Sequence, residues 1–315
     1  MCVVELDGPS ALEVLERDVP VRAADEVLVE VKAVAPAFPD LLMSQGKYQI
    51  KPDLPFSPGS DFAGIVLESP EGSEFVPGSR VAGCLSYGAA AERVAVTEDR
   101  LYPLPDDMGF VEAAAIPMNY LTAHFALVTR GNLTKGDWVM VLGASGGVGS
   151  ASIQVAAGLG AQVVAVVSDD ARAEVAREAG AHHVVLRDEV PDKVRDLTDG
   201  RGVDLVVDVV GGDIRNALRT LAPGGRVMAV GFASGEIPTV KVNRLLLTNT
   251  DVRGVESAYL WTAGISRQAW DDLMILNGDG YLKPLVQEGG SLGDYAAALE
   301  NLSARGVLGR VVLTV

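Results

Sequence analysis

The stretch that decides the fold is VMVLGASGGVGSASIQVAAGLGA, residues 139–161. An apolar strand ends at Gly143, a turn of small residues follows, and a helix begins near Gly147. The spacing Ala144-x-Gly146-x-x-Gly149 matches a dinucleotide-binding turn, with alanine at its first position. Gly146 would let the backbone approach a pyrophosphate, and Gly149 would let the helix pack tightly on the strand. The stretch predicts cofactor-binding residues Ser145, Gly146, Gly147, Val148 and Gly149. The alternative is a tight strand–helix turn that binds no nucleotide.

From Asp137 onward, strands and helices alternate along the chain. Apolar strands are expected at residues 138–143, 162–167, 182–186, 203–210 and 225–231. Helices are expected at residues 147–159, 170–179 and 213–221, with a short acidic helix before the fourth strand. Buried apolar strands that alternate with helices are typical of a parallel, doubly wound sheet, so this part of the chain is predicted to be α/β.

The first third of the chain is rich in β-strand patterns instead. Residues 26–34, EVLVEVKAV, alternate polar and apolar side chains, and further short strands follow between proline and glycine turns up to residue 105. This pattern predicts a compact β-barrel-like unit. Residues 109–131 are expected to be helical with a break or kink at Pro117. Near the end of the chain, helices are expected at residues 264–277 and 293–305, before a closing strand at 309–315.

Composition narrows the class of protein. The 315 residues include 42 acidic and 26 basic ones, a formal charge of −16, which argues against a nucleic-acid partner. The two cysteines, Cys2 and Cys84, exclude a disulfide framework and a cysteine-rich zinc site. No apolar run approaches the roughly 18 residues of a membrane span, and the N-terminus does not resemble a signal peptide. We therefore expect a cytoplasmic protein with no membrane partner.

The choice of nicotinamide cofactor depends on the end of the second strand of the sheet. NAD-specific sites place an acidic side chain there, but this chain has Ser168 at that point. Asp169 and Asp170 are better placed to cap the next helix, and Arg172 could pair with a 2′-phosphate. The pattern predicts NADPH. The alternative is that Asp169 holds the ribose of NADH and Arg172 is an ordinary exposed residue.

Five segments carry a family resemblance: LPFSPGSDFAGIV, EAAAIPMNYLTAHFAL, VLGASGGVG, GFASGEIP and GRVVL, beginning at residues 54, 112, 141, 231 and 309. Together they resemble the medium-chain dehydrogenase/reductase superfamily, and within it the zinc-independent NADPH:quinone oxidoreductases that include zeta-crystallin. The resemblance covers essentially the whole chain. It implies a GroES-like β-barrel catalytic domain (residues 1–115 and 256–315) and a Rossmann doubly wound parallel-sheet domain (residues 116–255). It also implies homodimers or tetramers built on Rossmann-domain edge strands, and we expect a homodimer through the Rossmann domain.

Zinc is not expected. Zinc-containing relatives carry a Gly-His-Glu segment where this chain has Gly59-Ser60-Asp61, and they have a four-cysteine structural lobe, whereas this chain has no cysteine cluster. The three histidines, His124, His182 and His183, are not spaced as ligands with a cysteine. We predict no metal site.

The resemblance also suggests site residues. Tyr48 matches a tyrosine near the nicotinamide and is the candidate proton donor or hydrogen-bond donor; the alternative is a lipophilic pocket wall or a loop tyrosine. Asp40 and Phe38 match pocket residues, and Asp40 is the second catalytic candidate. Thr122, Arg187, Gly231 and Phe232 are expected near the cofactor, although Thr122 could equally be a mid-helix hydroxyl and Arg187 an exposed charge. Asn243 resembles a family asparagine without an assigned contact.

One position departs from the family pattern. Relatives typically carry an asparagine where this chain has Ala37, within VAPAFPD at residues 34–40. The loss removes one amide but no acid or base, so we expect an altered site that still transfers hydride to a quinone or other conjugated carbonyl. Two alternatives stay open: a 2-enoyl-thioester or alkenal reductase with Tyr48 as the proton donor, and a cofactor-binding protein with little turnover.

Overall fold

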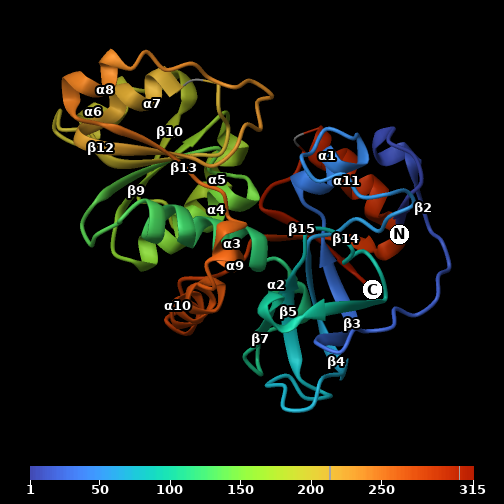
Figure 1. The fold of residues 1–315 in the computed structure, drawn as a ribbon. Helices are drawn as coiled ribbons and strands as arrows, with labels where there is room; N and C mark the ends of the chain where they lie inside the picture. Colours follow the sequence, from blue (N-terminus) through green and yellow to red (C-terminus); the bar gives the residue numbers. More distant parts are fainter. Residues whose placement is uncertain (213, 305) are drawn as a thin grey trace. The chain divides into compact units, whose positions relative to one another are not determined.

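The computed structural model describes residues 1–212, 214–304 and 306–315, and divides into two compact units. The first unit comprises Met1–Met118 and Val286–Val315, and the second comprises Asn119–Leu285 (Figure 1). The predicted helices at 213–221 and 293–305 each include one residue, 213 and 305, that lies outside the described residues. None of the helices among the described residues is both long and apolar enough to cross a membrane.

The second unit is built on a parallel sheet with the strand order β10-β9-β8-β11-β12-β13. All of its ladders are parallel, so the carboxyl ends of the strands share one edge. The strands are β8 (Trp138–Leu142), β9 (Gln162–Val167), β10 (His183–Leu186), β11 (Val203–Asp208), β12 (Leu221–Ala229) and β13 (Asp251–Gly254). Apolar side chains on both faces of the inner strands, such as Val139, Met140 and Val141, are fully buried. The predicted doubly wound sheet is present.

Helices cover both faces of this sheet. Figure 1 shows α6 and α7 on the side away from α4 and α5. The elements are α3 (Pro117–His124), a π-helical segment (Phe125–Arg130), α4 (Gly147–Gly158), α5 (Asp170–Glu178), α6 (Asp192–Leu197), α7 (Ile214–Thr220), α8 (Asn243–Thr248), α9 (Tyr259–Thr262) and α10 (Ser266–Gly278). A 3-10 turn (Arg187–Glu189) follows β10. The break expected at Pro117 is the junction between α2 (Phe110–Ala114) and α3.

The division of the chain differs from the sequence expectation in two segments. Residues 116–118 were expected with the second unit and lie in the first. Residues 256–285 were expected with the first unit, and the structure places them in the second. The physical reason is packing on α4: the Gln154 amide donates to the Lys283 carbonyl at 2.8 Å and accepts from the Lys283 N–H at 2.8 Å. A Cβ built on Gly158 would also lie 3.0 Å from Leu276 of α10. These contacts join segments far apart in sequence.

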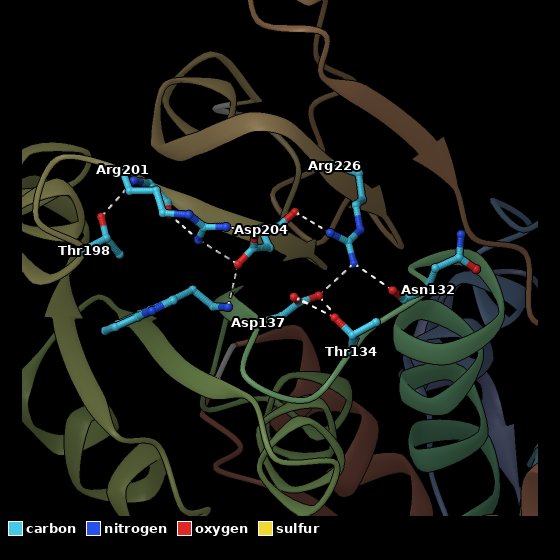
Figure 2. Close-up of polar contacts among 9 residues, drawn as sticks. Asn132, Thr134, Asp137, Thr198, Arg201, Asp204 and Arg226 are labelled. Atoms are coloured by element: carbon cyan, nitrogen blue, oxygen red, sulfur yellow. Dashed lines mark hydrogen bonds and ion pairs between the residues drawn. The ribbon is translucent and has the colours of Figure 1, made fainter.

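A polar network holds the amino-terminal edge of the same sheet (Figure 2). The Asp204 carboxylate, at the start of β11, accepts from the Trp138 N–H at 2.9 Å and from Arg201 at 2.9 Å. The Arg226 guanidinium donates to the Asp204 carbonyl at 3.0 Å and to the Asp137 carboxylate at 3.2 Å. These bonds tie β8, β11 and β12 together at the edge opposite the glycine turn.

The first unit is a mainly antiparallel sheet with the path β14-β15-β3-β4-β5-β7, and β6 also pairs with β3. Its strands are β3 (Glu26–Ala35), β4 (Asp61–Glu68), β5 (Arg80–Cys84), β6 (Arg93–Thr97), β7 (Leu101–Pro103), β14 (Val286–Ser291) and β15 (Arg310–Thr314), with β1 (Cys2–Val3) and β2 (Leu12–Glu13) as a separate pair. Its helices are α1 (Phe38–Ser44), α2 (Phe110–Ala114) and α11 (Tyr295–Ser303), with 3-10 turns at Gly8–Ala11, Glu98–Arg100 and Leu292–Asp294. Phe62 and Tyr295 are among its fully buried side chains. The closing strand therefore completes the first unit, as predicted.

Candidate functional site

The glycine turn between β8 and α4 has the conformation that the sequence predicts. Gly143 has φ +71°, and a Cβ there would lie 2.8 Å from both Val209 and Val210, so the position requires glycine. Gly146 is the N-cap of α4, with no side-chain cap. The first-turn N–H groups of a helix have no partner within the helix, and the positive end of the helix dipole lies there. The turn is therefore suited to hold an anion.

The two other glycines of the turn are packed closely. A Cβ on Gly149 would lie 2.9 Å from the Ala144 Cα and nearer still to the Gly143 carbonyl oxygen, so α4 lies against the end of β8. A Cβ on Gly147 would lie 3.0 Å from the Asn119 side-chain amide carbon. By contrast, a Cβ on Gly146 would meet only the Gly143 carbonyl oxygen, at 3.6 Å. Gly149 thus serves helix–strand packing, and Gly146 leaves space at the end of α4.

Two residues of this region were not predicted from sequence. Asn119 of α3 is buried and lies over Gly147, and the signal was an amide within the apolar run IPMNYLTAHF. Asp208 ends β11, and one carboxylate oxygen accepts from the N–H groups of Val210 at 2.9 Å and Gly211 at 2.8 Å. Its signal was an acid at the end of an apolar strand before two glycines. Asp208 shapes the loop next to the glycine turn.

The end of β9 carries the residues proposed to select the cofactor. Asp169 is the N-cap of α5, and its carboxylate accepts from the Arg172 N–H at 3.0 Å, as predicted for a cap. The same carboxylate accepts from the Ser168 hydroxyl at 2.7 Å and pairs with the Arg172 guanidinium at 2.6 Å. The Ser168 hydroxyl and then the Arg172 N–H hold the pKa of Asp169 below its usual range. A negatively charged Asp169 and a cationic Arg172 therefore stand together at this strand end.

The other predicted cofactor residues lie at different places. Arg187 directly follows β10 and is exposed, and Gly231 and the half-exposed Phe232 follow β12. All three stand at the carboxyl edge of the sheet with the glycine turn. Thr122 is buried on α3, and Asn243 is the exposed first residue of α8. The fold thus brings most of the predicted residues to one edge, while their contacts with a cofactor stay predictions.

Asp40 lies in a fully enclosed polar setting of the first unit. Its carboxylate accepts from the Ala37 N–H at 2.7 Å, the Gly59 N–H at 3.1 Å and the Tyr295 hydroxyl at 3.0 Å. Burial raises the pKa of Asp40, and these donors oppose the rise. The contacts give Asp40 a structural function at the start of α1. Its assignment to catalysis stays a prediction.

Tyr48 and Phe38 have different surroundings from Asp40. Tyr48 is half-buried and packs against the apolar cluster of Val3, Met43 and Phe56. Phe38, the first residue of α1, is 41% exposed. Ala37 is the N-cap of α1 and is only 1% exposed, so an asparagine at this position would need room that the alanine does not occupy.

Each of the three histidine rings contacts another side chain or a backbone N–H group. His124 pairs with Asp272 at 3.1 Å, the His182 ring accepts from the Val163 N–H at 3.1 Å, and His183 stacks on Trp138. Within the described part of the chain, no three His, Cys, Asp or Glu side chains are grouped to hold a metal ion.

Comparison with known proteins places this architecture in a family. The alcohol dehydrogenase GroES-like domain matches residues 23–106, and the family named zinc-binding dehydrogenase matches residues 147–273. A quinone oxidoreductase-like protein 2 homolog of Nematostella vectensis is 34% identical, over 91% of this chain and 81% of that protein. A probable oxidoreductase of Mycobacterium abscessus has a TM-score of 0.92 at 38% identity, covering 100% of this chain and 97% of that one. The quinone oxidoreductase of Escherichia coli, solved with NADPH, has a TM-score of 0.89 at 28% identity, covering 100% and 99%.

The fold and these matches define a two-unit α/β protein with a GroES-like domain and a Rossmann domain. The chain belongs to the medium-chain dehydrogenase/reductase superfamily, in its quinone oxidoreductase group. The predictions of family and fold class are confirmed.

Proposed function

We propose that this protein is an oxidoreductase that transfers a hydride from NADPH to a quinone or another conjugated carbonyl, without zinc. The observation that carries the proposal is the uncapped amino end of α4, where Gly146 leaves open space at the carboxyl edge of a parallel sheet. Ligands of doubly wound sheets bind at this edge. The names of the relatives, and the NADPH complex of the Escherichia coli enzyme, give further support.

The residues of the second unit would hold the cofactor, and NADPH would supply the hydride. The N–H groups at Gly147, Val148 and Gly149 would donate to the pyrophosphate. Arg172 would pair with the 2′-phosphate through charge-assisted hydrogen bonds. In the first unit, the Tyr48 phenol would donate a hydrogen bond to the oxygen of the carbonyl acceptor as negative charge develops there.

The donor set of the first unit supports chemistry without zinc. Ala37 offers no ligand atom, and Cys84 is buried with its thiol pKa raised well above the usual value by burial. The Asp61 carboxylate already accepts from Arg310 and from the Met118 N–H. Ala37 and Asp61 therefore offer no nitrogen or sulfur ligand, and burial disfavours the Cys84 thiolate that zinc would bind.

Loss of nicotinamide absorbance with a model quinone and a model enone tests the proposal, together with fluorescence quenching of bound NADPH. If neither NADPH nor NADH binds at micromolar concentrations, the proposal is wrong. Turnover of an enoyl-CoA that is lost in Tyr48→Phe, with quinone turnover kept, would favour the thioester reductase instead. Tight NADPH binding without turnover of any acceptor would favour a cofactor-binding protein.

We also propose that the chain forms a homodimer through the second unit. Strand β13 ends the sheet order, and the neighbouring helix α8 has no buried residue; Val242, Leu246 and Leu247 are each about three-quarters exposed. Antiparallel pairing of two β13 strands about Val252 would place Asp251 of each copy opposite Arg253 of the other. Light scattering after size exclusion should show a dimer that Leu246→Glu converts to monomer. A monomeric wild type would refute the pairing.

A further inference from the structure

The segment that carries Ala37 and Phe38 is held by a buried acid cluster, which we define as Asp40, Asp61, Tyr295 and Arg310. Asp40, Asp61 and Tyr295 are completely buried, and Arg310 is only 8% exposed. Tyr295 lies on α11 and Arg310 on β15, so both come from the last part of the chain. The two acids come from α1 and β4.

The Tyr295 half of the cluster acts on the start of α1. The Tyr295 hydroxyl donates to one Asp40 carboxylate oxygen at 3.0 Å, and the Ala37 N–H donates to the same oxygen at 2.7 Å. The other oxygen accepts from the Gly59 N–H at 3.1 Å. Asp40 therefore joins the backbone at position 37 to the loop before β4, and Tyr295 fixes the carboxylate that makes the join.

The Arg310 half acts on the end of β3. One guanidinium nitrogen of Arg310 donates both to the Ala35 carbonyl at 3.0 Å and to the Asp61 carboxylate. The other Asp61 oxygen accepts from the Met118 N–H at 3.0 Å. The backbone is thus held on both sides of Pro36, at the Ala35 carbonyl and at the Ala37 N–H.

The charges of the cluster do not balance, because it contains two carboxyl groups and one guanidinium, and the guanidinium pairs with Asp61. Burial raises the pKa of Asp61 to about 6, against the opposing effect of Arg310. A buried ionic group is weak evidence for stability, since apolar residues of the same volume often stabilise a fold as well or better. Buried polar networks instead hold backbone groups in a specific geometry.

We propose that Tyr295 and Arg310 are positioning residues: Tyr295 through Asp40, and Arg310 through its own bond to the Ala35 carbonyl while paired with Asp61, fix the backbone of residues 35–40 and so set where Phe38 meets the hydride acceptor. The effect on Phe38 and the acceptor rests on the proposed function. The fixing of the backbone is independent of it.

The test compares Tyr295→Phe with Tyr102→Phe, which removes a hydroxyl from another fully buried tyrosine of the same unit. In Tyr295→Phe, amide hydrogen exchange at Ala37 and Gly59 should become about fivefold faster, because the bond that orients Asp40 is lost. The control should leave these amides unchanged. Equal exchange at both amides in wild type and Tyr295→Phe would overturn the proposal, whether or not the wild type turns over a quinone.

Enzyme kinetics test whether the cluster sets the position of Phe38 against the hydride acceptor. In Tyr295→Phe, and more strongly in Arg310→Met, the KM for the quinone should rise about fivefold or more while the KM for NADPH stays unchanged. Arg310→Lys, which keeps the charge, should restore part of the quinone KM. A parallel rise of both KM values, or a loss of folded protein with no change in KM, would show a merely structural role. An inactive wild type would refute the proposed function, and the exchange experiment would still decide the positioning.

Discussion

Replacing Gly149 or Gly146 by alanine separates the packing role of Gly149 from the binding role proposed for Gly146. In Gly149→Ala the new Cβ would lie 2.9 Å from the Ala144 Cα and closer to the Gly143 carbonyl oxygen. Both neighbours are backbone atoms that cannot rotate away, so α4 would have to move off the end of β8. In Gly146→Ala the nearest atom is at 3.6 Å, and φ is −84°, which any residue adopts.

The magnitudes follow from these distances. Overpacking costs about 1–3 kcal/mol, and the upper end applies here because no side chain can yield. Alanine regains about 1 kcal/mol of helix propensity at a helical position. Gly149→Ala should therefore lower the free energy of unfolding by about 2 kcal/mol, which corresponds to a Tm lower by about 4–8 °C for a domain of this size. Gly146→Ala should change that free energy by less than about 0.5 kcal/mol.

The binding result should be the reverse. The Gly146→Ala methyl group would stand where the pyrophosphate approaches the end of α4, so the Kd for NADPH should rise at least about tenfold, or 1.4 kcal/mol. Gly278→Ala, at the end of α10 with no atom within 4 Å of the new Cβ, is the control for the glycine-to-alanine change itself.

Thermal unfolding by circular dichroism without cofactor and fluorescence titration with NADPH measure the two effects. A Gly149→Ala variant that unfolds at the wild-type temperature would refute the close approach of α4 to β8. A Gly146→Ala variant that binds NADPH as the wild type does would refute the position of the pyrophosphate.

Three further predictions concern the Asp169–Arg172 pair, His124 and Ala37. Arg172→Met should raise the Kd for NADPH about tenfold or more, because a charged hydrogen bond contributes about 1.5–3 kcal/mol, and it should leave the Kd for NADH unchanged. Asp169→Asn keeps the helix cap but removes the ion pair with the Arg172 guanidinium. In the same titration this variant should bind NADPH more tightly. Burial lowers the pKa of His124 in the folded protein, so as pH falls the unfolded state binds the proton first and the folded state loses stability. The fall in Tm between pH 7 and pH 5 should therefore be smaller in His124→Phe than in the wild type. An equal fall would contradict a buried neutral histidine. Ala37→Asn adds volume at a position 1% exposed, so overpacking of about 1–3 kcal/mol should outweigh a cap gain of about 1 kcal/mol and lower the Tm; a higher Tm would show that the amide has room.

The glycine turn and the alternation around it could be predicted because their causes are local. Gly143 needs a positive φ, the strands are apolar over short runs, and Asp169 caps a helix three residues ahead. The side-chain period and the turn residues are enough to give the parallel sheet and to place Ser168, Arg187 and Gly231 at its carboxyl edge.

The roles of particular side chains needed the tertiary structure. Asp40 was predicted to be catalytic because its segment resembles that of relatives. Its carboxylate, however, accepts hydrogen bonds from the Gly59 N–H and from the hydroxyl of Tyr295, which is 255 residues away in the sequence. Likewise, Asp61 meets Arg310 across 249 residues. Nothing in a local pattern reports such distant partners.

The same limit explains the boundary between the two units and the two residues near the glycine turn, Asn119 and Asp208, that were not predicted. An amphipathic helix such as α10 shows that one face is buried but not which surface covers it, so residues 256–285 could not be assigned from periodicity. Asn119 became a neighbour of Gly147 only when α3 was packed beside α4. The sequence by itself determined the elements, the glycine turn and the helix cap, because these depend on nearest neighbours. Which side chains meet depended on the packing of distant segments, and only the tertiary structure decided it.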